Sequence, residues 1–309
     1  MRAGTVTAWH AATMPFASAN GIQICYETFG DPADPALLLV MGFTAQLTAW
    51  DEEFCRLLVA GGRYVIRFDN RDCGLSTHLD GVRVDLPAVL KAWETDGEMP
   101  SIPYTMSDFS NDAFGLLDHI GITKAHIVGA SMGGMIVQAM AIEHPERVLS
   151  MTSIMSTTGE REFYQWAPET RAAMSTPPPT DREGFVAHSV EMRRLLVGPE
   201  YFDPSAAADR SAAAYDRAFY PEGAVRQTAA IRGSGDRAAG LRALKVATLV
   251  IHGRADTLIK PIGGERTAEL IDGANLVVFH HMGHDLPRQL WPSITDLILS
   301  HTTHAILAQ

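Results

Sequence analysis

The chain contains only three cysteines in 309 residues, Cys25, Cys55 and Cys73, and they form no C-x-x-C pair. An odd, scattered set of this kind argues against a disulfide scaffold and against a zinc ribbon. We therefore expect three buried thiols. Cys73 lies in a turn-rich loop and is the best candidate for reactivity, although nothing around it indicates a lowered pKa.

Positive charge and long apolar runs are also scarce. Lys and Arg number 25 against 36 Asp and Glu, which gives a net charge of -11, and the basic residues are scattered. Nucleic acid and anionic membrane surfaces are therefore not expected partners. No stretch reaches membrane-spanning length without glycine, histidine or charged interruptions. Nothing in the sequence indicates whether the chain forms a homo-oligomer.

The N-terminal segment 1–19 is ambiguous as a targeting signal. Arg2 and the ending Ala17-Ser18-Ala19 resemble parts of a signal peptide, but threonine, histidine and proline interrupt what should be a continuous apolar core. We treat residues 1–19 as an N-terminal extension and expect a cytoplasmic protein, with secretion left open.

The rest of the chain shows no solenoid repeat and alternates between apolar β-type runs and helical patterns. Its hydrophobic content of 46% is enough for a sizeable core. Strands are predicted near 21–28, 36–41, 64–68, 125–130, 148–154, 247–252 and 275–280, with helices near 51–60, 107–119, 132–143, 262–271 and 286–301. This alternation predicts an α/β fold with a mostly parallel, doubly wound sheet. The amphipathic strand at 21–28 is expected at an antiparallel edge.

The pentapeptide Gly129-Ala130-Ser131-Met132-Gly133 stands between a predicted buried strand and a predicted helix. A Gly-x-Ser-x-Gly sequence in this context is typical of a nucleophile elbow, where a tight turn exposes the serine at a helix N-terminus. The alternative is a glycine-rich connection or a phosphate-binding loop. Residues 129–134 fit neither G-x-G-x-x-G nor the P-loop, which requires a lysine.

A serine nucleophile needs a base and an orienting carboxylate, and in this architecture they follow in the order Ser, Asp or Glu, His. Asp256 follows the predicted strand at 247–252, and His284 lies in the loop after the strand at 275–280. We predict Asp256 as the acid and His284 as the base of a triad with Ser131.

Both assignments have rivals. Asp256 could serve only as a turn or helix-capping residue, and Asp285 is an alternative carboxylate. His280 and His281 are close enough to compete with His284, but Gly283 favours a tight loop around His284. His252 is expected to be a structural core histidine. His119, His126 and His144 lack an accompanying ligand set, so we predict no metal site.

These residues resemble the α/β hydrolases, from about Asn20 to the last helix. The resemblance is carried by Gly-Ala-Ser-Met-Gly-Gly, the late Asp256 and Met282-Gly-His-Asp-Leu-Pro287 in the family's order. Further similar stretches are Asp31–Pro35, Phe68–Asp72 and Gly121–His126. Within the superfamily the chain is similar to bacterial carboxylesterases of the aclacinomycin methylesterase type, which cleave a methyl ester from a polyketide acid. Dehalogenase and epoxide hydrolase chemistry is disfavoured, because those relatives carry Asp at the position of Ser131.

By matching position, the resemblance implies that the backbone amides of Phe43 and Met132 form an oxyanion hole. Many relatives have His-Gly after the early strand, whereas this chain has Met41-Gly42. The departure is tolerable because the donors are backbone amides. The alternative is that Phe43 only packs over the pocket, and the two roles are compatible.

Residues 157–242 break the strand and helix alternation and are predicted to form a helical cap inserted between two core segments, 20–156 and 243–309. Aromatic residues of this insertion are expected near the elbow, and we take Phe43, Trp166, Tyr215 and Phe219 as candidate substrate-binding residues. For each cap residue the alternative is helical core packing.

The expected activity is therefore that of a serine carboxylesterase acting on a small-molecule carboxylic ester, with methyl esters among the candidates, through an acyl-enzyme and without metal or organic cofactor. The alternatives on the same triad are a carbon-carbon bond hydrolase, a lactonase or a perhydrolase. An alternative of another class is a ligand receptor with this fold that does not turn over.

Overall fold

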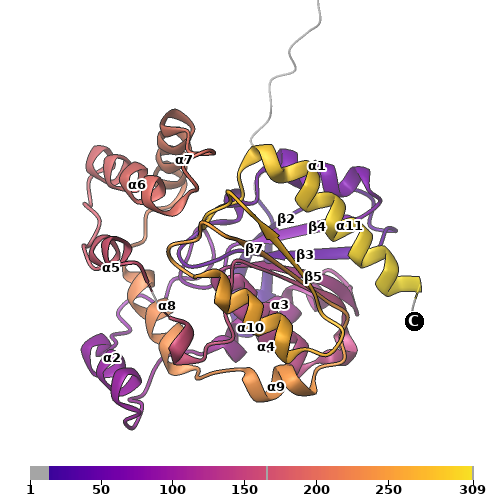
Figure 1. Cartoon of the computed structure of the whole chain (residues 1–309), viewed down its shortest axis with the longest axis horizontal. Coiled ribbons are helices and arrows are strands. Elements are labelled where there is room, and N and C mark those ends of the chain that lie inside the picture. The colour runs from indigo at the N-terminus through magenta and orange to yellow at the C-terminus, as the bar shows by residue number, and fades with distance from the viewer. Residues whose placement is uncertain (1–13, 165, 308–309) are drawn as a thin grey trace, which may run out of the picture.

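The computed structural model describes residues 14–164 and 166–307, and the first 13 residues of the predicted extension lie outside them. The described chain folds around one eight-stranded sheet with the order β1-β2-β4-β3-β5-β6-β7-β8 (Figure 1). Its strands are β1 (Phe16–Ala19), β2 (Ile22–Phe29), β3 (Ala36–Val40), β4 (Tyr64–Phe68), β5 (Ala125–Ala130), β6 (Val148–Ile154), β7 (Thr248–Gly253) and β8 (Asn275–Phe279). All seven predicted strands are present.

Strands β3 to β8 pair in parallel, whereas β2 is antiparallel to both of its neighbours. The mostly parallel sheet is thus confirmed, but the edge position predicted for residues 21–28 is wrong. The edge strand is β1, which lies within the segment predicted as an extension. Asn20 and Gly21 have φ values of 46° and 79°, and an Asn-Gly pair with both φ angles positive makes the two-residue turn of a β-hairpin.

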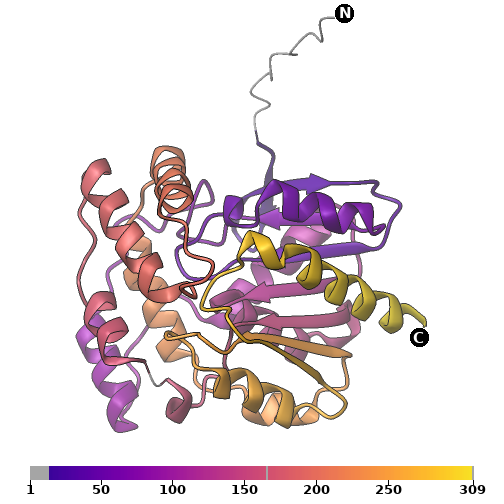
Figure 2. The ribbon, with the colours of Figure 1, turned by 45° about the horizontal axis from the view of Figure 1, so that its top comes forward.

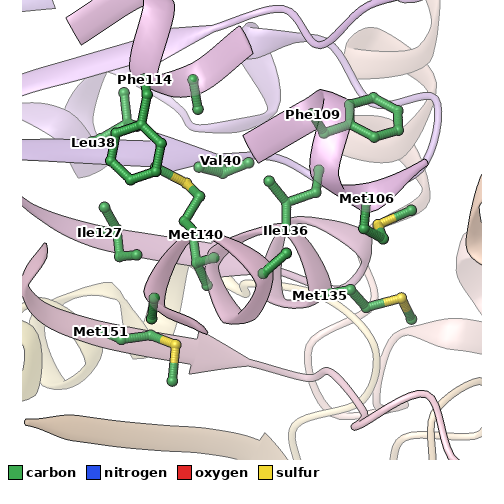
Figure 3. Close-up of a cluster of buried hydrophobic side chains, with 14 of the residues drawn as sticks. Leu38, Val40, Met106, Phe109, Phe114, Ile127, Met135, Ile136, Met140 and Met151 are labelled. Atoms are coloured by element: carbon green, nitrogen blue, oxygen red, sulfur yellow. The ribbon is translucent and has the colours of Figure 1, made fainter. Parts of the chain in front are cut away.

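Helices cover both faces of the sheet because its central strands are buried on both sides. In β3 every residue is buried. Leu38 and Val40 pack towards α3 (Met106–His119) and α4 (Met132–Glu143), as Figure 3 shows. The alternate residues Leu37 and Leu39 pack with α1 (Glu52–Ala60) and α11 (Trp291–Leu307) on the other face.

Helix α10 (Pro261–Leu270) packs against β7 and β8. The C-terminal helix starts later than the predicted 286, because Pro287 is followed by a short 3-10 turn, Arg288–Leu290, and α11 begins only at Trp291. Within residues 14–164 and 166–307, no helix combines the length and the apolar character needed to cross a bilayer.

Between β6 and β7, where the cap was predicted, the described residues form five α-helices. They are α5 (Pro168–Met174), α6 (Arg182–Leu196), α7 (Pro204–Arg217), α8 (Glu222–Gly233) and α9 (Ala238–Ala243). Helices α5 to α8 lie to one side of the sheet, together with α2 (Leu86–Thr95), which packs on α8 (Figures 1 and 2). In contrast, α9 packs against α4 and α10 on the sheet itself.

Candidate active site

The turn between β5 and α4 holds Ser131 in a strained conformation. Its φ and ψ are 57° and -119°, values that side chains larger than hydrogen rarely adopt. A Cβ at Gly129 would lie 2.1 Å from the carbonyl oxygen of Gly133, and one at Gly133 would lie 2.1 Å from that of Val40. Both glycines are therefore needed because backbone approaches them, which is the steric reason for a Gly-x-Ser-x-Gly sequence.

Hydrogen bonds from the neighbouring strand hold the strained residue in place. The Ser131 amide donates to the carbonyl of Ile154 at 2.9 Å, and the Ser156 hydroxyl donates to the Ser131 carbonyl at 2.8 Å. The first turn of α4 adds the amides of Gly134 and Met135, which donate to the same carbonyl. The elbow is thus fixed by the end of β6 as well as by its own turn.

Asp256 follows β7 in a turn that uses both oxygens of its carboxylate. Oδ1 accepts hydrogen bonds from the amides of Leu258 at 2.9 Å and Ile259 at 2.8 Å. Oδ2 faces His284 Nδ1 at 2.7 Å. The turn-forming role considered as an alternative for Asp256 is therefore real, and one carboxylate combines it with a contact to the histidine.

His284 lies between Asp256 and Ser131, because its Nε2 is 2.9 Å from Ser131 Oγ. Its amide donates to the carbonyl of Leu196 at 2.7 Å, so the end of α6 positions this loop. A Cβ at Gly283 would come within 2.2 Å of that same carbonyl. Gly283 is thus needed for close approach of the α6 end, rather than for the tight turn that we expected.

The rival residues lie elsewhere. Asp285 pairs with Arg193 at 3.4 Å, and the exposed His281 lies 3.2 Å from a carboxylate oxygen of Glu200. His280 is exposed and packs edge-on against His281. His252 is fully buried, and its Nε2 contacts the carbonyl of Ile259 at 2.7 Å, in agreement with the structural role predicted for it.

The electrostatics of the pair favour an ionised carboxylate. Burial by itself would raise the pKa of Asp256, but the adjacent His284, together with a contact to His252 at 3.5 Å, outweighs it and lowers that pKa. A buried carboxylate that stays charged can hold Nδ1–H of the imidazole and stabilise the imidazolium form. The His284 side chain is only 8% exposed, so this interaction is largely shielded from water.

The loop after β3 approaches the elbow from the other side. A Cβ at Gly42 would lie 3.0 Å from both the Ala130 carbonyl oxygen and Ser131 Cβ, and 3.5 Å from the amide nitrogen of Met132. The amide of Met132 is the first of α4, and the first amides of a helix lack an intrahelical acceptor. Glycine at position 42 therefore brings the segment that carries Phe43 against the helix start.

Two residues missed by the sequence analysis support that loop. The side-chain amide of Asn70 donates to the carbonyl of Met41 at 2.8 Å. Gln227, on α8, accepts a hydrogen bond from the amide of Thr44 at 2.8 Å. Gln227 is distant in sequence, and no local pattern could have connected it with this loop.

The four candidate substrate-binding residues occupy different surroundings. Phe43 is partly buried and packs against the core that includes α4. Trp166 lies against the guanidinium of Arg232. Tyr215 and Phe219 stack on each other, and Phe185 of α6 packs against both, tilted to Tyr215 and edge-on to Phe219.

Cysteine and metal chemistry have little support in the described part of the chain. Cys25, Cys55 and Cys73 are free and buried, and burial raises the pKa of Cys25 and Cys55 to about 12 and raises that of Cys73 as well. The suggested reactivity of Cys73 is therefore not supported. Among these residues no group of three or more His, Cys, Asp or Glu side chains could hold a metal ion.

A family model described as the alpha/beta hydrolase fold matches residues 35–287. This chain belongs to the α/β hydrolase family, and it is a hydrolase of that family. The predicted fold class and the predicted family are both confirmed.

Among characterised sequences, the chain is similar to rhodomycin D methylesterase DnrP of Streptomyces peucetius. The two are 29% identical over 306 residues, which cover 92% of this chain and 96% of that protein. It is also 32% identical over 195 residues to 2-hydroxymuconate semialdehyde hydrolase of Pseudomonas putida, covering 59% of this chain and 63% of that one. The enol-lactonase structure from Burkholderia xenovorans matches 94% of this chain and all of its own with a TM-score of 0.72, but at 22% identity it supports the fold alone.

Proposed function

We propose that this protein is a serine carboxylesterase that hydrolyses a carboxylic ester, with Ser131 as nucleophile, His284 as general base and Asp256 as its orienting acid. The observation that carries the proposal is the hydrogen-bonded chain from Ser131 Oγ through both imidazole nitrogens to Asp256 Oδ2, at 2.9 and 2.7 Å. Such a chain is what activates a weakly nucleophilic hydroxyl. A methyl ester is the first substrate class to test, because the full-length relative is named a methylesterase.

The reaction follows from the roles of these groups. His284 Nε2 accepts the hydroxyl proton as Ser131 Oγ attacks the ester carbonyl, and Asp256 stabilises the imidazolium that forms. The amides of Phe43 and Met132 are proposed to donate to the tetrahedral oxyanion. The imidazolium then protonates the leaving alcohol. In the second half of the reaction, water attacks the acyl-enzyme while His284 accepts its proton, and the imidazolium returns a proton to Ser131 Oγ as the acid leaves. This chemistry requires neither a metal ion nor an organic cofactor.

We further propose that residues 157–242 act as a cap over this site. Two contacts favour coupling between cap helices and catalytic loops: the end of α6 holds the His284 amide, and Gln227 of α8 holds the Thr44 amide. Phe43 and Trp166 remain candidates for substrate contact, and so do Tyr215 and Phe219.

The deciding experiment replaces Ser131 by Ala and measures hydrolysis of p-nitrophenyl acetate and a panel of methyl esters. The variant should lose at least about 1,000-fold in kcat, because the attacking oxygen is gone. Ser156→Ala is the matched control, since it removes a hydroxyl beside the elbow that bonds only the Ser131 backbone. Full activity of Ser131→Ala on these esters would exclude the proposed mechanism.

Carbon-carbon bond hydrolysis and lactone opening are the second candidate activities. A relative named 2-hydroxymuconate semialdehyde hydrolase and one named 3-oxoadipate enol-lactonase favour them, over 59% and 48% of this chain respectively. Vinylogous diketone acids and lactones therefore belong in the same screen. A receptor without turnover would show at most one equivalent of product per protein chain in every arm.

A further inference from the structure

Among the described residues, one buried cation at the junction of cap and core has neither a carboxylate nor a hydrogen-bond acceptor as partner. Six arginines of the described chain are buried: Arg63, Arg67, Arg71, Arg226, Arg232 and Arg237. Arg67, Arg71 and Arg226 each pair with a carboxylate. Arg63 and Arg237 donate instead to hydroxyl, amide or carbonyl oxygens.

Arg232 alone in this set donates no hydrogen bond to any described residue. It is 9% exposed, and its Nη1 is buried without an acceptor. Leaving a guanidinium in this condition is costly, since a buried charge is normally paired or hydrogen-bonded. Burial lowers its pKa and nearby Arg171 acts in the same direction, while Tyr164 and Glu94 act against them; Glu94 forms no ion pair with Arg232.

Three aromatic rings surround the guanidinium. Its Cζ lies 4.2 Å from the ring centroids of both Trp93 and Tyr164, and 5.5 Å from that of Trp166. Stacking on aromatic faces retains a cation in place, but it uses the faces of the planar group and leaves the N–H edge free for an acceptor. Each of the three residues is only partly buried, and access of a ligand to that edge requires the displacement of one ring.

A series of contacts connects this cage with the turn that carries Ser131. The Tyr164 hydroxyl donates to Met135 Sδ at 3.9 Å, and the Met135 amide bonds the Ser131 carbonyl one helical turn away. Arg237 adds a second buried positive charge at the start of the segment that leads to Tyr164, because its Nη2 donates to the carbonyl of Thr157. Two buried cations without carboxylate partners, in a chain of net charge -11, favour an anionic ligand at this position.

We propose that Arg232 binds a carboxylate of the substrate, so that the protein prefers esters that carry a free acid group over neutral esters. A carboxylate presents two coplanar oxygens that match the guanidinium edge, and this gives both orientation and affinity in a site shielded from water. The inference rests on the proposed esterase function, because it specifies the substrate class of that site. It makes Arg232 a specificity-determining residue that does not touch the reacting atoms.

The test compares monomethyl and dimethyl esters of the same dicarboxylic acids, from succinate to suberate, so that only the free carboxylate differs. For at least one chain length, kcat/KM should be tenfold or more higher for the monoester. Arg232→Gln should bring this ratio close to one, mainly through KM, and Arg232→Lys should restore part of it. Arg210→Gln is the matched control, because it removes an exposed positive charge from α7, and it should retain the ratio.

Equal or better hydrolysis of the diester at every chain length, or an unchanged ratio in Arg232→Gln, would overturn the inference while leaving the esterase proposal intact. A purely structural cation would lower both rates together and lower Tm without changing the ratio. If no ester is hydrolysed, calorimetry of Ser131→Ala with the dicarboxylates separates the two proposals. If the dicarboxylates bind to Ser131→Ala but not to the double variant Ser131→Ala, Arg232→Gln, the carboxylate site is supported and only the esterase proposal fails. If they do not bind to Ser131→Ala, the carboxylate site is excluded as well.

Discussion

At the scale of single residues, the positive φ of Ser131 is the clearest sign of a conformation imposed by its surroundings. At 57°, this φ is one that a side chain with a Cβ seldom adopts. Strain of this kind costs about 1–3 kcal/mol and is retained where the neighbouring structure over-determines it. Here the bonds from Ile154 and Ser156 supply that restraint.

The strain predicts an order of stability between two variants that lack the hydroxyl of Ser131. Ser131→Gly should be more stable than Ser131→Ala by about 1 kcal/mol, because glycine adopts positive φ freely and both variants lack the hydroxyl. Urea unfolding at pH 7 measures the difference. Equal stability of the two variants would show that the elbow stores no strain at this position.

His126 is a buried titratable residue away from the active site. Its side chain contacts Ser150 Oγ at 2.8 Å, while its Nε2 has no partner in the described chain. Burial, with smaller contributions from Arg63 and His301, lowers its pKa to about 4. The folded protein therefore binds fewer protons at this site than the unfolded chain between about pH 6.5 and pH 4.

Stability should accordingly fall as the pH decreases through that interval, by about 3 kcal/mol for this one group. In His126→Asn, which keeps a polar atom facing Ser150, the dependence of unfolding free energy on pH should be flatter by this amount. Denaturant unfolding at several pH values measures it. The exposed His119→Asn variant serves as control, and a slope equal to wild type in His126→Asn would contradict the assignment.

At the scale of elements, the β5–α4 turn depends on backbone contact with a different strand. The helical residue Gly133 touches the end of β3, because an added Cβ would lie 2.1 Å from the Val40 carbonyl oxygen and 2.9 Å from that of Met41. These atoms belong to the backbone of a buried central strand, which has little freedom to move. The elbow and the loop carrying Phe43 are therefore one packed unit.

Gly133→Ala should separate that unit. We expect a loss of at least tenfold in kcat for ester hydrolysis and a destabilisation of about 1–3 kcal/mol, because one methyl group must displace backbone. Gly62→Ala is a suitable comparison, since a Cβ there meets no atom within 4 Å and only its positive φ is strained. Activity should survive in Gly62→Ala. Equal activity in the two variants would argue against a packed elbow.

At the scale of the whole molecule, buried ion pairs connect the inserted helices with the loop after β4. Arg226 of α8 binds the Asp72 carboxylate through Nε at 2.7 Å and Nη2 at 2.9 Å, and the Tyr104 hydroxyl donates to the same group at 2.7 Å. Arg217 of α7 binds Asp69 at 2.7 Å. The bidentate geometry of the Arg226 pair and the burial of both carboxylates make these contacts specific, so they set how α7 and α8 lie against the core.

Arg226→Met should therefore destabilise the protein by about 3–5 kcal/mol, because it leaves the Asp72 carboxylate buried without its cation. The double variant Arg226→Met, Asp72→Asn should recover part of that loss. Thermal and urea unfolding give the measurement, and Arg182→Met at the exposed pair with Asp216 should change stability far less. If Arg226→Met and Arg182→Met lowered the free energy of unfolding by the same small amount, the buried Asp72 carboxylate would not depend on Arg226.

The strand pattern and the chemistry-bearing motifs were readable from local sequence because each depends on neighbours in the chain. Seven strands and the helices at 51–60, 107–119, 132–143 and 262–271 follow from apolar periodicity and turn residues. Strand β1 was not predicted, because the small residues Ala17 and Ala19 resemble a signal-peptide cleavage site. The Asn20-Gly21 pair, which is typical of a hairpin turn, does indicate a strand before it. The predicted start of the last helix, at 286, is too early, because Pro287 and the 3-10 turn after it precede α11.

What the sequence determined by itself is the fold class, and it also predicted Ser131, Asp256 and His284 as a candidate triad, since backbone sterics and strand-to-loop position are encoded locally. Only the tertiary structure decided which partners surround them. Three features depend on the docking of α6, α7 and α8: the contact of Leu196 with the His284 amide, the carboxylates paired with Arg217 and Arg226, and the lack of a carboxylate for Arg232 among the described residues. Such contacts join residues distant in the chain, and short-range patterns carry no information about them.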